Sequence, residues 1–108
     1  MFKNLFRSKD PDSPRYRLAK AKELNGHAIR YVTERKNDND AVIGKGGAVS
    51  FRDGEVIVFS SADVVFRCRA EELQAWDLLS GDGVVLTGPD AEHGGVFRTV
   101  TVHYVYYR

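Results

Sequence analysis

Residues 46–69, GGAVSFRDGEVIVFSSADVVFRCR, decide the fold. Three apolar-rich runs are separated there by Asp53-Gly54 and by the small polar residues 60–63. Asp-Gly accommodates the positive φ angles of a two-residue type I′ turn, so it is a strong signal for a β-hairpin. The stretch therefore predicts three consecutive antiparallel strands.

The turn at Asp53-Gly54 also predicts which residues pair. In the first hairpin Arg52 faces Glu55, and the pairing continues to Ala48 opposite Phe59. For the second hairpin we expect the pairs Phe59–Val64, Val58–Val65 and Ile57–Phe66. A slip of one residue in that second register would exchange the two faces of the strand.

A helix is predicted before this region, over residues 13–25. Ser13 can cap its first turn, Pro14 suits the first helical position, and Asn25-Gly26 ends it. Leu18, Ala21 and Leu24, with Tyr16 nearby, form an apolar stripe for docking on the sheet. Four basic side chains lie largely away from that stripe: Arg15, Arg17, Lys20 and Lys22. Residues 1–12 are expected to form a flexible tail with basic and apolar side chains.

Further strands are predicted on both sides of the central stretch, at residues 27–34, 41–43, 84–87 and 96–108. The glycines of residues 44–47 indicate a bulge or bend that lets one long strand turn a corner of a barrel, and not a phosphate loop, because the spacing of a phosphate loop is absent. Residues 70–79 fit a short helix or a strand, and we favour a strand from about Gln74 with Trp76 in the core. The last strand has apolar side chains on both faces, so it is expected to be covered on each side or to offer an edge for self-association.

The composition is that of a single globular domain: 108 residues, 43% hydrophobic and 29% charged. The only cysteine, Cys68, lies in an apolar strand and is expected to be a small buried side chain. No stretch resembles a membrane span or a signal peptide, so the expected location is cytoplasmic. The charge is uneven, since residues 1–30 hold eight basic and three acidic side chains.

No catalytic or metal-binding constellation stands out. Asp90, Glu92 and His93 share one loop, but no second ligand cluster supports a metal site there. Asp38 and Asp40 lack the glycine and the distal glutamate of a calcium loop. We therefore predict no cofactor, no metal and no enzymatic activity, with a small enzyme using His93 or His103 as a lesser alternative.

Together these signals predict an α+β domain that is mostly β, over residues 13–108. Seven or eight short antiparallel strands would curl into a roll or a partly open barrel, with the N-terminal helix packed on it. LLSGDGVVLTGPD followed by FRTVTVHYVYYR resembles small β-rich proteins of Firmicutes whose function is uncharacterised. That resemblance implies a β-rich fold and implies no activity.

The leading functional hypothesis is a non-enzymatic binding or assembly module that acts through protein–protein contacts. Its contact surface would be Tyr104, Tyr106 and Tyr107, although the same tyrosines could instead fill the core. The partner would be another protein or a second copy joined through an edge strand. The alternative is binding to nucleic acid or an anionic membrane through Arg15, Arg17, Lys20 and Lys22.

Overall fold

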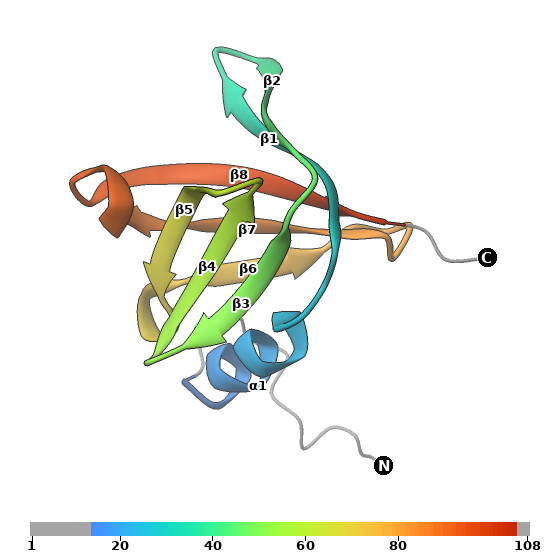
Figure 1. The fold of residues 1–108 in the computed structure, drawn as a ribbon. Coiled ribbons are helices and arrows are strands. Elements are labelled where there is room, and N and C mark those ends of the chain that lie inside the picture. Colours follow the sequence, from blue (N-terminus) through green and yellow to red (C-terminus); the bar gives the residue numbers. More distant parts are fainter. Residues whose placement is uncertain (1–13, 106–108) are drawn as a thin grey trace.

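The computed structural model describes residues 14–105, which form one helix and eight strands (Figure 1). The helix is α1 (Pro14–Leu24), and two short 3-10 turns are η2 (Ala70–Glu72) and η3 (Ala91–His93). The strands are β1 (Ile29–Lys36), β2 (Asn39–Lys45), β3 (Ala48–Arg52), β4 (Glu55–Ser60), β5 (Asp63–Arg69), β6 (Gln74–Asp77), β7 (Gly83–Asp90) and β8 (Val96–Tyr104). The prediction of a mostly β chain with one helix is confirmed.

The strands form two antiparallel sheets that pack against each other. The larger sheet has the order β2-β1-β8-β7-β6, and the smaller has the order β3-β4-β5 (Figure 1). Neither sheet closes on itself among residues 14–105, so a barrel is not supported. The core lies between the sheets, where Val49 and Val56 of the small sheet and Leu86 and Val100 of the large sheet are fully buried.

The hairpin at Asp53-Gly54 forms with the predicted register. Both turn residues have positive φ angles, 53° and 77°, as a type I′ turn requires. The pairs run from Arg52–Glu55 to Ala48–Phe59 as expected.

The second hairpin follows the prediction only at its first pair, Phe59–Val64. A register shift after Phe59 places Val58 opposite Phe66, so the predicted pair Val58–Val65 is wrong. The shift directs the large ring of Phe66 into the core, where it is fully buried, and leaves the smaller Val65 partly exposed. Cys68 is also fully buried, as predicted.

The glycine-rich bend carries the chain from the large sheet into the small one, between β2 and β3. Gly47 has a φ of 111°, and a Cβ there would come within 1.9 Å of the carbonyl oxygen of Phe59. A side chain at this position would therefore clash with the backbone of β4. The predicted bend is confirmed, but it separates two strands of different sheets and does not turn one long strand around a barrel corner.

Helix α1 ends as predicted, with Gly26 at a φ of 92°, whereas the proposed cap Ser13 and the tail of residues 1–12 lie outside the described residues. Ala21 and Leu24 are buried, but Leu18 is 46% exposed, so the apolar stripe is only partly correct. Lys20 was expected to lie away from the stripe and is instead buried. Its ammonium nitrogen lies 2.7 Å from an oxygen of Asp77 in β6.

The C-terminal half corrects two predictions. The strand from Gln74 is confirmed, but Trp76 is not in the core: it pairs with Val85 and is 42% exposed. Strand β8 pairs with β1 on one side and with β7 on the other, which makes it the central strand of its sheet. Of the two alternatives expected for the last strand, a free edge for self-association is wrong for residues 96–104, because β8 has a neighbouring strand on each side.

Candidate functional site

The outer face of the five-stranded sheet, opposite the core, is the most distinctive surface in the described chain, and we call it the open face. Side chains alternate along a strand and paired residues share a face, so its members follow from the observed registers. Its side chains are Tyr31, Thr33, Arg35, Asp40, Val42, Lys45, Gln74, Trp76, Val85, Thr87, Pro89, Phe97, Thr99, Thr101 and His103, so the charged members are confined to β1 and β2. The inward positions between them include the fully buried Val32, Val84 and Val102.

The open face lacks charge across β6, β7 and β8. None of its nine members on those strands is Asp, Glu, Lys or Arg. Trp76 is 42% exposed and Phe97 is 68% exposed, and on the opposite edge Val42 is 53% exposed. The solvent side of an antiparallel sheet normally carries polar and charged residues. Exposed aromatic groups without charge are instead typical of the centre of a protein interface.

One row of side chains crosses all five strands of the open face. The observed pairs connect Trp76 to Val85, Val85 to Thr101, Thr101 to Thr33, and Thr33 to Val42. Thr101 occupies the middle of the row because β8 is the middle strand. The row therefore runs from one exposed apolar side chain to another, with smaller groups between them.

Contacts between neighbouring strands order several of these side chains. The rings of Tyr31 and His103 stack with their centres 4.2 Å apart, and the hydroxyls of Thr87 and Thr99 lie 3.0 Å apart. Burial and the nearby Arg30 guanidinium lower the pKa of His103, against the smaller effects of Asp82 and Asp40. The His103 imidazole is therefore neutral at neutral pH, which keeps the β8 part of this face uncharged.

The outer face of the small sheet has the opposite character. Arg67 pairs with Glu55 at 3.1 Å and with Glu92 at 3.2 Å. The Arg52 guanidinium lies 5.9 Å from the centre of the Phe59 ring. Charged groups paired in this way are typical of a solvated surface. The two outer faces of the same domain thus differ sharply in charge.

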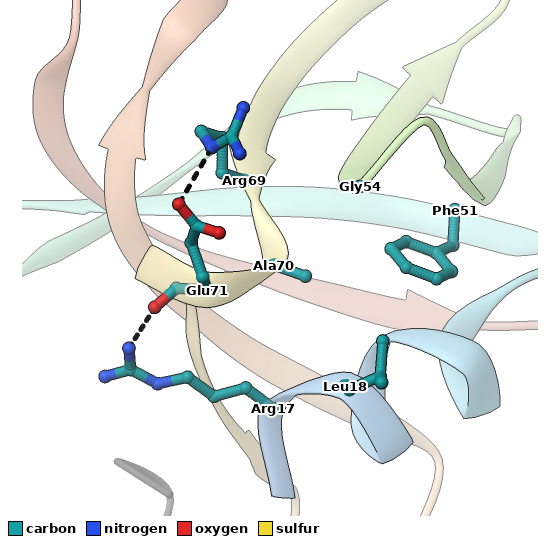
Figure 2. A pocket seen from close by; sticks show the side chains of 7 residues that line it. All are labelled: Arg17, Leu18, Phe51, Gly54, Arg69, Ala70 and Glu71. Atoms are coloured by element: carbon teal, nitrogen blue, oxygen red, sulfur yellow. Dashed lines mark hydrogen bonds and ion pairs between the residues drawn. The ribbon is translucent and has the colours of Figure 1, made fainter. Parts of the chain in front are cut away.

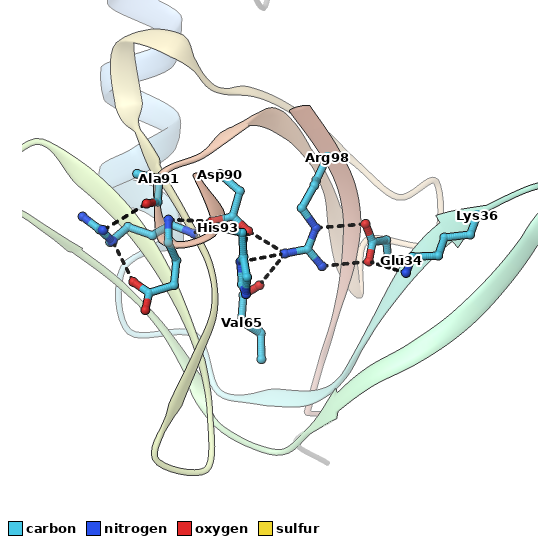
Figure 3. A network of polar contacts seen from close by, with 9 residues as sticks. Glu34, Lys36, Val65, Asp90, Ala91, His93 and Arg98 are labelled. Carbon is cyan, nitrogen blue, oxygen red and sulfur yellow. Dashed lines mark hydrogen bonds and ion pairs between the residues drawn. The ribbon is translucent and has the colours of Figure 1, made fainter. Parts of the chain in front are cut away.

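A second polar feature lies where the two sheets meet at β5, and Figure 3 shows its side chains. Arg98 of β8 donates to both carboxylate oxygens of Glu34 in β1, at 2.9 and 2.7 Å. The same guanidinium donates to Asp90 and to the carbonyl oxygen of Val65 at 3.1 Å. Glu34 is 10% exposed, and Asp90 is completely buried.

Asp90 completes this network from the end of β7. Its Oδ1 accepts from the backbone amides of Arg67 and Glu92, and its Oδ2 lies 2.6 Å from Nδ1 of His93. Burial alone would raise the pKa of Asp90, but hydrogen bonds from His93, Arg98 and the two amides together lower it. The hydrogen bonds from Arg98 likewise lower the pKa of Glu34.

The hydrogen bonds of this network connect the edge of β5 to the large sheet. Strand β5 is an edge of the small sheet, and its amide at Arg67 and carbonyl at Val65 are satisfied by Asp90 and Arg98. Side chains of the large sheet thus supply bonds that a neighbouring strand would otherwise provide. This accounts for Asp90 and His93 without metal or acid–base chemistry. No group of three or more His, Cys, Asp or Glu residues within 14–105 could hold a metal ion.

A small pocket of about 210 Å³ lies between α1 and one end of the small sheet (Figure 2). Its lining is Arg17, Leu18, Phe51, Gly54, Arg69, Ala70 and Glu71. The two guanidiniums already have partners, because Arg17 donates to the carbonyl oxygen of Glu71 and Arg69 donates to its carboxylate at 3.2 Å. Ligand sites usually occupy about 300–1,000 Å³, so this pocket is small for a ligand site.

The side chains predicted as sites from sequence do not come together. Tyr104 is half-buried, packs against the core and stacks on His27 at 4.1 Å, which fits the core alternative. Tyr106 and Tyr107 lie outside the described residues. Of the four basic residues, Arg15 and Lys22 are exposed, whereas Arg17 and Lys20 bond to the body of the domain.

No protein-family model, curated protein or solved structure matches this chain. The resemblance to small β-rich proteins of Firmicutes therefore stays a prediction. No helix within residues 14–105 is long and apolar enough to span a membrane.

Proposed function

We propose that this protein is a protein-association module and that the open face is its contact surface. The observation that carries the proposal is the uncharged surface of β6, β7 and β8, from which Trp76 and Phe97 project. Aromatic side chains are enriched at interface cores, and charged side chains are depleted there. A neutral His103 in the stack with Tyr31 fits the same role.

The edges of the sheets are less suited to association than the face. Strand β3 bonds to the segment before β1, because the amide of Gly26 donates to the carbonyl oxygen of Val49 and the amide of Val49 donates to that of His27. The Tyr16 hydroxyl of α1 donates to the carbonyl oxygen of Ala75 in the four-residue strand β6. Protected or short edges disfavour pairing with a further strand.

Strand β2 is protected in another way. Its pairing with β1 is interrupted by a register shift at Val32 and Thr33, and its ends carry Asp40 and Lys45. Bulges and charged residues both discourage a second chain from adding to an edge. Association across the face therefore has more support than the edge-strand contact expected from sequence.

Anion binding through α1 has less support. Lys20 is buried and its ammonium group lies within bonding distance of both Asp77 and Glu23. Arg17 donates to the backbone of η2. Arg15 and Lys22 are then the two exposed members of the predicted basic set. Binding to a phosphate backbone needs more positive side chains than these two.

The test is site-specific photo-crosslinking in the native cellular environment. A benzophenone side chain at Phe97 samples the open face, and one at Arg52 samples the outer face of the small sheet as a matched control. We expect protein adducts at Phe97 that are weak or missing at Arg52 and that disappear when Thr101→Lys places a charge on the face. Equal adduct yields at the two positions, or adducts unaffected by Thr101→Lys, would refute the proposal.

A further inference from the structure

We propose that the partner of the open face is a second copy of this chain, bound face to face around a two-fold axis that runs along β8. This inference rests on the proposed function and specifies its partner. Strand β8 is the third of five strands, so rotation about it exchanges β1 with β7 and β2 with β6. The two sheets would then stack with their strands nearly aligned, which is a common packing of sheets.

The row of side chains across the open face is complementary to itself under this rotation. Thr101 lies at the axis opposite Thr101 of the second copy, and Val85 lies opposite Thr33. At the ends, Trp76 of each copy lies opposite Val42 of the other. Trp76 and Val42 are 42% and 53% exposed, so the largest ring meets a small exposed aliphatic group. A two-fold interface contains each such contact twice, and Trp is the side chain most enriched among energetic anchors.

The charges beside the open face favour this axis over one perpendicular to β8. Residues 71–82, around β6, contain four acidic side chains and no Lys or Arg, and two of the four, Glu71 and Asp77, are ion-paired with Arg69 and Lys20. The β1–β2 hairpin and its flanks, residues 30–45, contain four basic side chains and three acidic ones, of which Glu34 is already bonded to Arg98. An axis along β8 brings the basic hairpin of one copy over the acidic β6 region of the other. A perpendicular axis would instead place the two basic hairpins together, which electrostatic complementarity disfavours.

The area of the open face is sufficient for such a pair. Five strands spaced by about 4.8 Å and some seven residues long at about 3.3 Å per residue span roughly 500 Å². Two copies would bury about 1,000 Å² in total, at the lower limit for a specific interface. The dimer should therefore be reversible and concentration-dependent, and it should dissociate over a micromolar range of protein concentration.

The symmetry also predicts how the dimer responds to pH. Open-face residues of β8 lie along the axis, so His103 of each copy lies close to His103 of the other. The groups that face this imidazole within one copy are the Tyr31 ring, the Arg30 guanidinium and the carboxylates of Asp40 and Asp82. Protonation at acidic pH would place two positive charges near each other, beside two arginines, and the dimer should weaken.

Sedimentation velocity over a wide range of concentration tests the pairing. We expect wild type to pass from monomer to dimer with rising concentration. Thr101→Lys should raise the dissociation constant at least tenfold because it brings two ammonium groups to the axis. The matched control Ser50→Lys, on the outer face of the small sheet, should leave the constant unchanged. If Thr101→Lys does not fold, Val42→Lys at the exposed edge serves in its place.

A charge-swap variant tests the specific axis. W76E and V42K should each weaken the dimer, and the double variant W76E/V42K should recover at least part of the loss, since residues 76 and 42 of different copies would face each other. A dimer that Thr101→Lys disrupts but that the double variant does not recover would overturn the axis along β8.

A wild-type protein that stays monomeric at several hundred micromolar would overturn the pairing with a second copy. Adducts at Phe97 with a different protein would then still support association through the open face. If wild type stays monomeric and Phe97 also gives no protein adducts, both the proposed function and this inference are refuted.

Discussion

Replacing Arg98 with leucine removes the group that holds the β5 edge against the large sheet. Arg98 bonds to two carboxylates, and its side chain is only 15% exposed. Breaking a buried ion pair from one side costs about 3–5 kcal/mol because a charge is left without compensation. Asp90 would keep the amides of Arg67 and Glu92, whereas Glu34 would keep Lys36 at 3.8 Å. We therefore expect a loss in the lower half of that range, about 3–4 kcal/mol.

The pH dependence of this loss in unfolding free energy shows whether it comes from lost charge interactions or from lost side-chain packing. Arg98 lowers the pKa of Glu34 and helps to lower that of Asp90, so both carboxylates stabilise wild type above their ordinary values of 4.5 and 3.8. That contribution is lost as pH falls through the lowered values. In Arg98→Leu the pKa values of both carboxylates are higher than in wild type, because the hydrogen bonds from Arg98 are gone while burial remains. The variant is therefore less stable than wild type at neutral pH, and protonation of the carboxylates reduces the difference. The difference between the two proteins should shrink from pH 7 toward about pH 4.

Urea unfolding followed by circular dichroism measures both effects. Arg69→Leu is the matched control, since Arg69 pairs with Glu71 while both side chains are more than half exposed. We expect no measurable change in that variant, because exposed ion pairs contribute little. An Arg98→Leu loss below about 1 kcal/mol, or a loss that is equal at neutral and acidic pH, would refute the account of the network.

Three further substitutions or measurements follow from single contacts. Gly47→Ala should lower the free energy of unfolding by about 2 kcal/mol or more, because a Cβ would overlap the Phe59 carbonyl and φ is 111°; an unchanged urea midpoint would contradict this. Lys20→Met should change stability by less than about 1 kcal/mol, since the Asp77 carboxylate is 54% exposed and water can solvate it; a larger loss on urea unfolding would show that the pair matters. Burial, with smaller effects of Glu72 and Asp90, raises the pKa of the Cys68 thiol to about 12, so an aromatic disulfide reagent should react with it only as the protein unfolds; rapid reaction of the native protein would contradict its burial.

The central fold could be predicted because its signals are local. Asp53-Gly54 specifies both a turn type and a register, and the observed pairs follow from it. The second hairpin could not be predicted fully, because the choice between Val65 and Phe66 at the core depends on the space that the opposite sheet leaves. Strand order in the large sheet also depends on partners distant in sequence, which is why β8 was not expected at its centre.

The open face could have been recognised only in part from sequence. Phe97, Thr99, Thr101 and His103 alternate along one strand, so the sequence alone places these four side chains on one face. The contribution of Trp76 was missed because a tryptophan in a short strand is more often buried. The role of Arg98 was missed as well, since its partners Glu34 and Asp90 come from two other strands and only the fold brings them together.

The uncharged face has two explanations, and stability measurements distinguish them. If its threonines and aromatics were needed to stabilise the monomer, Thr101→Lys would lower the free energy of unfolding, as substitutions at packed positions do. If they are present for association, the same substitution should alter the unfolding of the dilute monomer by no more than about 0.5 kcal/mol, the usual range for a surface position. Its effect should then appear only at concentrations where wild type is a dimer, because binding stabilises the folded state by mass action. Urea midpoints for Thr101→Lys and wild type should therefore coincide at low concentration and diverge at high concentration. Midpoints that differ equally at every concentration would mean that the face serves folding and not assembly.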